Sequence, residues 1–291
     1  MLTRHFRFTC REIVILTRKA RAAHDNVRYV SWDGQNPGEW SRELEAADAV
    51  VNLCGKEVDC RYTPENQAEI IRSRLGPTKA VAAAINACVQ APKLWINLAS
   101  STIYRHAEDR PQTESGGDIG NGSSVDVCRS WEGTFFGSET PGTRKAALRT
   151  SFVLGRSGGA FVKLRMLVLA GLGGHQGTGR QMVSWIHEQD FARIVEWLLK
   201  HPEADGAYNV AAPNPVNNRE LMRSIRKAFN IPVGLPTPAW LLAIGARIIG
   251  TEPELVLKSR WVLPERLTAG GFRFYYESLQ PAINDIAGTR L

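Results

Sequence analysis

The sequence lacks the long apolar runs that membrane proteins need. None of its 291 residues belongs to a run of roughly 18 apolar residues, the length of a membrane span. The opening Met1 to Cys10 has no apolar core of a signal peptide. The five cysteines, an odd number, form no CxxC pair, which argues against a disulfide framework or a zinc site. These absences predict a cytoplasmic protein with reduced thiols, no membrane partner and no metal.

Acidic residues are scarce in the first thirty positions, where seven arginines and lysines face only Glu12 and Asp25. The whole chain carries a net charge of +7. A basic cluster can indicate nucleic-acid binding. This one is not interleaved with aromatic residues and belongs to no nucleic-acid-binding motif. We therefore predict no nucleic-acid partner and attribute the charge to a solvated helix face and a site for a cofactor phosphate.

Short apolar runs alternate with helical patterns along most of the chain. The runs that predict strands are 13–16, 49–53, 94–98, 148–154 and 208–210. The segments that predict helices are 64–74, 78–89, 125–136, 190–200 and 218–229. Strands that are apolar throughout suit a parallel sheet buried on both faces, so we predict a doubly wound α/β fold. The last eighty residues, punctuated by proline, predict a smaller, mainly helical domain.

Four motifs stand at predicted strand ends or helix starts. They are Asp48 to Gly55 (DAVVNLCG), Leu98 to Tyr104 (LASSTIY), Leu148 to Gly155 (LRTSFVLG) and Ser184 to Asp190 (SWIHEQD). In this order they resemble the motifs of extended short-chain dehydrogenases/reductases. The resemblance implies a Rossmann-type sheet that binds NAD(P).

A narrower resemblance covers nearly the whole chain. Its segments are Arg61 to Thr63, Ser73 to Arg74, Val127 to Glu132, Gly171 to Gln181 and Leu263 to Phe272. They are similar to an epimerase-family subgroup with a C-terminal domain of unknown function, whose members are often labelled nucleoside-diphosphate-sugar epimerases or cell-division inhibitors. The resemblance implies a cofactor domain at 1–157 completed by 184–212, and a substrate-side domain at 158–183 and 213–291. It implies no particular substrate.

The glycine-rich turn that holds a dinucleotide pyrophosphate is missing from the sequence. By the family pattern, residues 2–8 match the end of the first helix and residues 12–17 match the second strand. Roughly fifteen residues of the pattern are absent, about one strand and a tight loop. We expect a truncated start and impaired cofactor binding, with a degenerate cofactor site as the alternative.

The end of the second strand of the pattern reads Thr17-Arg18-Lys19 and has no acidic residue. NAD enzymes place an acid there, whereas NADP enzymes use a cation for the 2′-phosphate. Arg18 and Lys19 therefore predict NADP, unless they are only a solvated pair. The other cofactor-binding residues that the resemblance implies are Leu53, Cys54, Gly55 and Ala99.

The resemblance also implies a catalytic set of Ser or Thr with a Tyr-x-x-x-Lys pair. It places the serine at Ser100, but Ser124 stands at the tyrosine position and Cys128 at the lysine position. Neither can do the standard chemistry. Tyr104 is either a replacement proton donor or a packed aromatic residue.

Five further residues are implied on the substrate side of the site. Ser101 lies beside Ser100, and Arg149 either anchors a strand end or contacts substrate. His187 is expected mainly to support the neighbouring loop. Arg180 and Gln181 follow a glycine-rich loop that either closes over a ligand or is a flexible connection.

Two functions stay open from the sequence. The first is an NADP(H)-dependent epimerase or oxidoreductase with an unknown substrate. The second is a non-catalytic dinucleotide-binding or regulatory protein that keeps the fold without the Tyr-Lys pair.

Overall fold

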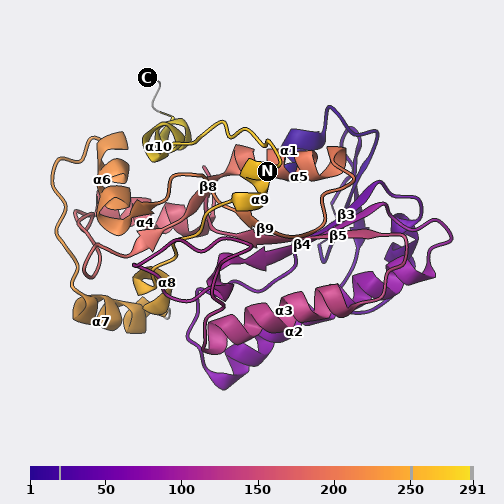
Figure 1. Ribbon diagram of the computed structural model, residues 1–291, viewed down its shortest axis with the longest axis horizontal. Helices are drawn as coiled ribbons and strands as arrows, with labels where there is room; N and C mark the ends of the chain where they lie inside the picture. Colours follow the sequence, from indigo (N-terminus) through magenta and orange to yellow (C-terminus); the bar gives the residue numbers. More distant parts are fainter. Residues whose placement is uncertain (20, 250–251, 289–291) are drawn as a thin grey trace.

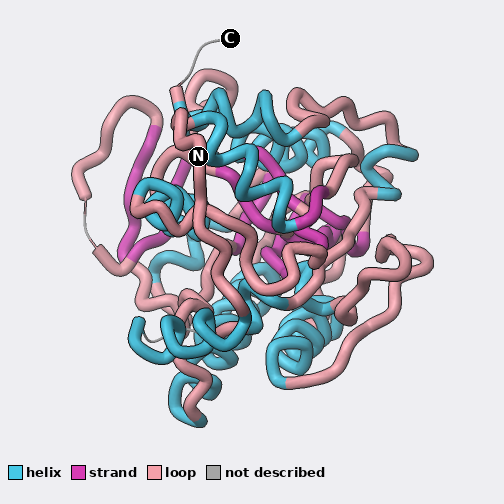
Figure 2. The backbone as a smooth tube through the Cα atoms, turned by 90° about the vertical axis from the view of Figure 1, so that its left-hand side faces the viewer, coloured by secondary structure: helices cyan, strands magenta, loops and turns pink. Residues whose placement is uncertain are grey.

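A parallel sheet forms the middle layer of the computed structural model, which describes residues 1–19, 21–249 and 252–288. Figure 1 shows α2 (Pro64–Ala87) and α3 (Ser123–Gly137) below the sheet and α1 (Leu2–Phe6) and α5 (Glu188–Lys200) above it. The main strands are β1 (Ile13–Thr17), β2 (Val27–Ser31), β3 (Ala49–Asn52), β4 (Leu94–Ser100), β5 (Arg144–Thr150) and β9 (Gly206–Val210). Figure 2 shows most of the strands in the interior among the helices, and one group of strands at the edge on the left.

The strands form two parallel groups. β1 pairs with β2, and the order of the larger group is β3-β4-β5-β9. Within the described residues, β1 and β3 are not hydrogen-bonded neighbours. This is the predicted doubly wound sheet without its central first strand. In the part of the chain that the structure describes, no helix is long and apolar enough to cross a membrane.

A second core lies at the end of the molecule shown on the left in Figure 1. Its parallel strands are β6 (Phe152–Leu154) and β8 (Trp185–His187), and its antiparallel strands are β7 (Met182–Val183) and β10 (Val216–Asn217). The helices around it are α4 (Gly159–Leu169), α6 (Asn218–Ala228) and α10 (Leu279–Ala287). The remaining short elements are η1 (Glu39–Leu44), η2 (Ser101–Ile103), α7 (Ala239–Ile249), α8 (Glu254–Leu257) and α9 (Glu265–Ala269).

Two element predictions were wrong in detail. The helices expected at 64–74 and 78–89 are one helix, α2, which runs through Pro77. Proline removes one helical donor, but Val81 and Ile85 are buried beyond it, and this packing outweighs the lost bond. The strand expected at 148–154 is divided at Ser151, because the Ser151 N–H donates to the Val210 carbonyl while β6 pairs with β8.

Candidate functional site

The carboxyl ends of β3, β4 and β5 lie side by side at one edge of the sheet. The parallel register aligns Asn52 with Asn97 and Ser100 with Thr150. Open parallel sheets bind their ligands at this edge. The predicted site residues that the register brings there are Leu53, Cys54, Gly55, Ala99, Ser100, Ser101 and Arg149.

Two buried asparagines shape the turn after β3. Asn52 Nδ2 donates to Asn97 Oδ1 at 2.7 Å, and Asn52 Oδ1 accepts from the Cys54 N–H at 3.0 Å. Because buried amides need such partners, the pair holds the turn in one conformation. Leu53 is 44% exposed on this turn. A Cβ on Gly55 would lie 3.3 Å from Arg74 Cζ, so glycine lets the guanidinium approach the turn closely.

Ser100 ends β4 and caps the short helix η2. Its Oγ accepts from the Thr102 N–H at 3.2 Å. Among the described residues no hydrogen bond donated by this hydroxyl is found, so its proton is available to a ligand. Ser100 is half-buried, whereas Ala99 and Ser101 are buried on either side of it. Their roles stay predictions.

The Tyr104 hydroxyl belongs to a buried network. It donates to Asn209 Oδ1 at 2.9 Å and accepts from Arg149 Nη1 at 2.8 Å. Arg149 also forms a two-pronged ion pair with Glu132, at 2.9 and 2.8 Å. Burial raises the pKa of Tyr104, and the positive charge of Arg149 opposes the shift. The geometry favours a packed aromatic for Tyr104 and an anchor for Arg149 over direct roles in chemistry.

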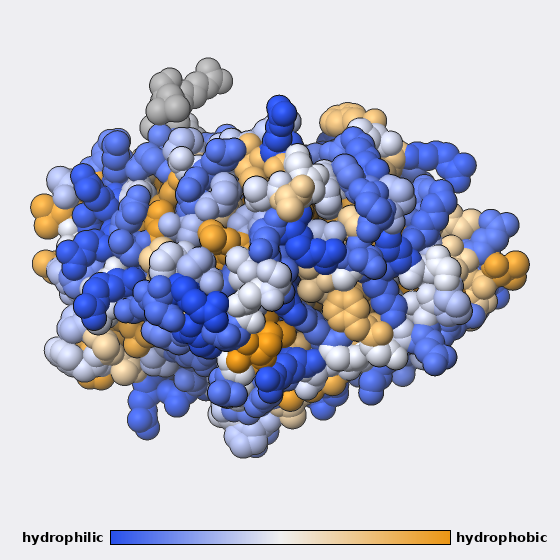
Figure 3. Space-filling model, viewed as in Figure 1, coloured by the Kyte–Doolittle hydropathy of each residue, from blue (hydrophilic) through white to orange (hydrophobic). Residues whose placement is uncertain are grey.

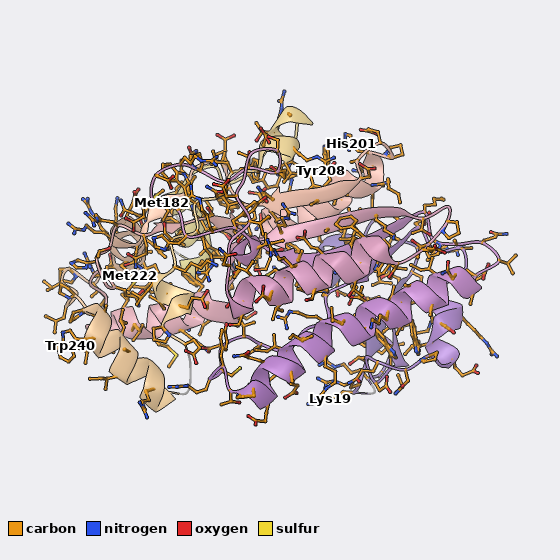
Figure 4. The ribbon with its side chains drawn as sticks, turned by 60° about the horizontal axis from the view of Figure 1, so that its bottom comes forward. Lys19, Met182, His201, Tyr208, Met222 and Trp240 are labelled. Carbon is orange, nitrogen blue, oxygen red and sulfur yellow. The ribbon has the colours of Figure 1, made fainter. Side chains whose placement is uncertain are left out.

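Arg18 and Lys19 follow β1 directly and are exposed. Lys19 lies at the lower edge of the molecule in Figure 4. Burial raises the pKa of the Cys54 thiol, and the positive charge of Arg18 opposes that shift. Arg18 is therefore within electrostatic reach of the turn after β3, although β1 and β3 do not pair.

Two of the remaining predicted residues are buried and form hydrogen bonds with the backbone. His187 is fully buried; its Nδ1 accepts from the Gln189 N–H at 3.1 Å, and burial lowers its pKa. Gln181 is buried, and its Nε2 donates to the Gln176 carbonyl at 2.9 Å. Arg180 is exposed beside it. Contact of these three with a substrate stays a prediction.

A polar cluster beside the start of α3 joins residues that are far apart in the sequence. Ser124 Oγ donates to Glu254 Oε2 at 3.0 Å, across 130 positions. The Tyr62 phenol lies beside Ser124 and Glu254, and Lys258 Nζ lies 3.7 Å from Glu254 Oε1. Sequence reasoning gave Tyr62, Glu254 and Lys258 no role. The motif at 61–63 was the one signal for a role of Tyr62, and it did not indicate which distant residues Tyr62 would contact.

Cys128 lies about one helical turn after Ser124 on α3 and is 5% exposed. Burial raises the pKa of its thiol to about 11, and the negative charge of Glu132 adds to the shift. A thiol attacks as the thiolate, so Cys128 is a poor nucleophile at neutral pH.

The described surface is also hollowed away from these residues. A hollow of about 460 Å³ lies at the opposite edge of the sheet, where its lining includes Arg144, Lys145 and Gly206 near the amino ends of β5 and β9. The face in Figure 3 is mostly hydrophilic, with separate apolar patches. Within the described ranges, no group of three or more His, Cys, Asp or Glu side chains could hold a metal ion.

Comparisons with known proteins extend over most of the chain. Residues 237–286 match a family model described as a domain of unknown function, DUF1731. The epimerase family protein YfhF of Bacillus subtilis (strain 168) is 30% identical over 282 residues, which are 96% of this chain and 90% of the relative.

Solved structures are similar as well. Human epimerase family protein SDR39U1 (isoform 2), solved with NADPH, has a TM-score of 0.87 and 26% identity, covering 99% of this chain and 95% of the human one. A nucleoside-diphosphate sugar epimerase from Corynebacterium glutamicum has a TM-score of 0.72 and 28% identity, covering 94% of this chain and 52% of the other.

Proposed function

This chain belongs to the epimerase family, with the fold of extended short-chain dehydrogenases/reductases, and from this premise we propose that it is an NADP(H)-dependent epimerase or oxidoreductase. The observation that carries the proposal is the position of three features at the carboxyl ends of parallel strands, the edge at which open sheets bind ligands. They are the exposed Arg18, the turn after β3 and the half-buried Ser100. The cytoplasmic location predicted from the composition stays a prediction.

The residues at this edge fit NADP(H). Arg18 suits the 2′-phosphate, because a guanidinium binds phosphate oxygens in pairs, and Lys19 adds a second positive charge. Leu53 is an exposed apolar side chain that can pack against the adenine ring. The segment before β1 contains no glycine, so the described residues supply no glycine-rich turn there for the pyrophosphate.

Ser100 has the position that the chemistry requires. Bound NADP(H) supplies or accepts a hydride. Ser100 ends a central strand and its hydroxyl proton is available, so it can donate a hydrogen bond to the carbonyl oxygen of a substrate. Ser101 supports the turn after β4, as does the hydrogen-bonded network of Arg149, Tyr104 and Glu132. These residues do not contact the reacting atoms.

A non-catalytic dinucleotide-binding protein is the second candidate. It is favoured by the engaged Tyr104 hydroxyl and by the protonated Cys128 thiol, which leave no evident replacement for the Tyr-Lys pair among the predicted catalytic residues. An assay of NADPH oxidation by the purified protein with a panel of carbonyl compounds distinguishes the two functions. Oxidation with any member of the panel indicates an enzyme.

Replacing Arg18 with aspartate tests the cofactor choice. We expect Arg18→Asp to weaken NADPH binding about fivefold and NADH binding less than twofold, because only NADPH places a phosphate beside the new negative charge. Fluorescence titration with both nucleotides measures the difference. Arg42→Asp is the matched control, since Arg42 is an exposed arginine on η1. Equal loss of both nucleotides would contradict the assignment of Arg18.

A further inference from the structure

Large apolar side chains are exposed at the end of the molecule that carries α4, α6 and α7, and we call this surface the apolar end. They come from the loop after α4, from segment 231–238 and from α7. These side chains are Leu172, Val233, Leu235, Trp240, Leu241 and Ile244. Figure 4 shows Trp240 at the outer end of the molecule, and Figure 3 shows apolar groups at the same end. Exposed apolar side chains gathered in one region mark an interaction site.

Backbone hydrogen bonds hold the two loop segments of the apolar end together. The Leu235 N–H donates to the Gly171 carbonyl at 2.9 Å, and the Gly174 N–H donates to the Leu235 carbonyl at 3.1 Å. The Thr237 N–H donates to the His175 carbonyl at 3.0 Å. Because these bonds fix segment 233–237 along the loop after α4, the surface that they present is formed before any partner arrives.

The helix α7 is apolar but is not covered by the rest of the chain. Its sequence, AWLLAIGARII, contains a single charged residue, Arg247. None of the α7 side chains that the structure describes is buried, and Trp240 is 66% exposed. Trp240, Ile244 and Arg247 share one side of the helix, because residues three and four apart lie on the same face. A helix this apolar is ordinarily buried, so α7 is suited to a partner outside the chain.

The charge around the apolar end is of one sign. Neither 140–187 nor 221–251 contains an aspartate or a glutamate. Arg226 lies beside the loop after α4, since its Nη1 donates to the Gly173 carbonyl at 2.6 Å. The next acidic residue after α7, Glu252, pairs with Arg61. The cations of α6 and α7 in the acid-free stretch are Arg223, Arg226, Lys227 and Arg247. An apolar surface bordered by these cations is complementary to an apolar surface bordered by anions.

A membrane with anionic headgroups matches both properties. Its interior accepts the apolar side chains of an interfacial helix, its headgroup layer favours tryptophan, and its charge attracts arginine and lysine. A second copy of the chain fits less well, because a twofold interface brings the same patch, and therefore the same cations, together from both sides.

We propose that the apolar end binds the surface of a membrane that contains anionic lipids, with α7 lying in the plane of the headgroups. The composition predicted no membrane partner because no apolar run is long enough to cross a bilayer. A helix that lies in the membrane surface needs no such run, so the inference departs from that prediction. It goes beyond the proposed function and requires neither cofactor nor turnover.

Vesicle sedimentation of the purified protein tests the proposal. The vesicles contain phosphatidylcholine alone or equal parts of phosphatidylcholine and phosphatidylserine. We expect binding to the anionic vesicles, weakened by added salt and much weaker without phosphatidylserine. Val233→Glu should weaken binding about tenfold, because it replaces an apolar contact with a repelled charge. Val89→Glu is the matched control, since Val89 and Val233 are 94% and 70% exposed.

A second pair of variants tests the charge separately. Lys227→Gln should weaken binding about fivefold, the contribution of one cation near an anionic surface. Lys79→Gln, which removes an exposed cation of α2, should leave binding unchanged. Thermal unfolding verifies that each variant is folded, which its exposed site favours.

Three results would overturn the proposal. The first is no binding to anionic vesicles, or equal binding to both kinds. The second is equal weakening by Val233→Glu and Val89→Glu. The third comes from analytical ultracentrifugation: if Val233→Glu converts an oligomer to a monomer and the wild type does not bind vesicles, the apolar end is an interface between copies. Each of these results leaves the proposed function intact, because NADPH binding and oxidation are measured without vesicles.

Discussion

Replacing Arg149 with methionine is expected to lower the free energy of unfolding by about 3 kcal/mol, because removing one partner of a buried ion pair leaves the other charge uncompensated. The side chains of Arg149 and Glu132 are 14% and 10% exposed, and two hydrogen bonds join them. Arg149 also donates to the buried Tyr104 hydroxyl. Urea unfolding followed by circular dichroism measures the loss.

Two further variants make this test specific. Adding Glu132→Leu to Arg149→Met removes the stranded carboxylate and should restore part of the loss. Lys93→Gln breaks an exposed pair with Asp48, whose side chains are 80% and 83% exposed, and should cost less than about 1 kcal/mol. If Arg149→Met keeps full stability but abolishes turnover, Arg149 contacts the substrate and our interpretation of it as an anchor is wrong.

Replacing Ser100 with alanine is expected to lower turnover at least tenfold, equivalent to about 1.4 kcal/mol of activation free energy. Ser100 has a hydroxyl proton available at the carboxyl end of a central strand, where it can polarise a substrate carbonyl. The measurement is NADPH oxidation with any carbonyl substrate that the protein accepts. NADPH affinity should change little, because this hydroxyl acts on the substrate.

Cys128→Ser is the control for Ser100→Ala and should be tolerated. The thiol is buried, and its raised pKa, about 11, keeps it protonated at neutral pH. Serine is close to it in size and likewise neutral. Should Cys128→Ser abolish turnover while Ser100→Ala leaves it intact, the reaction depends on a thiol and Ser100 has been assigned wrongly.

Most of the fold could be predicted from local sequence patterns. The runs at 13–16, 49–53 and 94–98 became β1, β3 and β4, because a strand buried in a parallel sheet needs a continuous apolar run. Short strands such as β7 and β10 have two residues each and give no periodic signal. The continuity of α2 through Pro77 could not be predicted either, since it depends on packing that local propensity does not record.

By itself, the sequence determined the class of the protein and the strand ends at which we propose its site. The turns after β3 and β4 are local in the chain, and their motifs placed Leu53, Gly55 and Ser100 at one edge of a parallel sheet. Only the tertiary structure decided what those residues face. In the folded protein the Tyr104 hydroxyl donates a hydrogen bond to Asn209, and Lys258 donates one to the Thr102 carbonyl across 156 positions. Such contacts depend on the packing of separate regions, and no local pattern in a single sequence specifies which distant charges will meet.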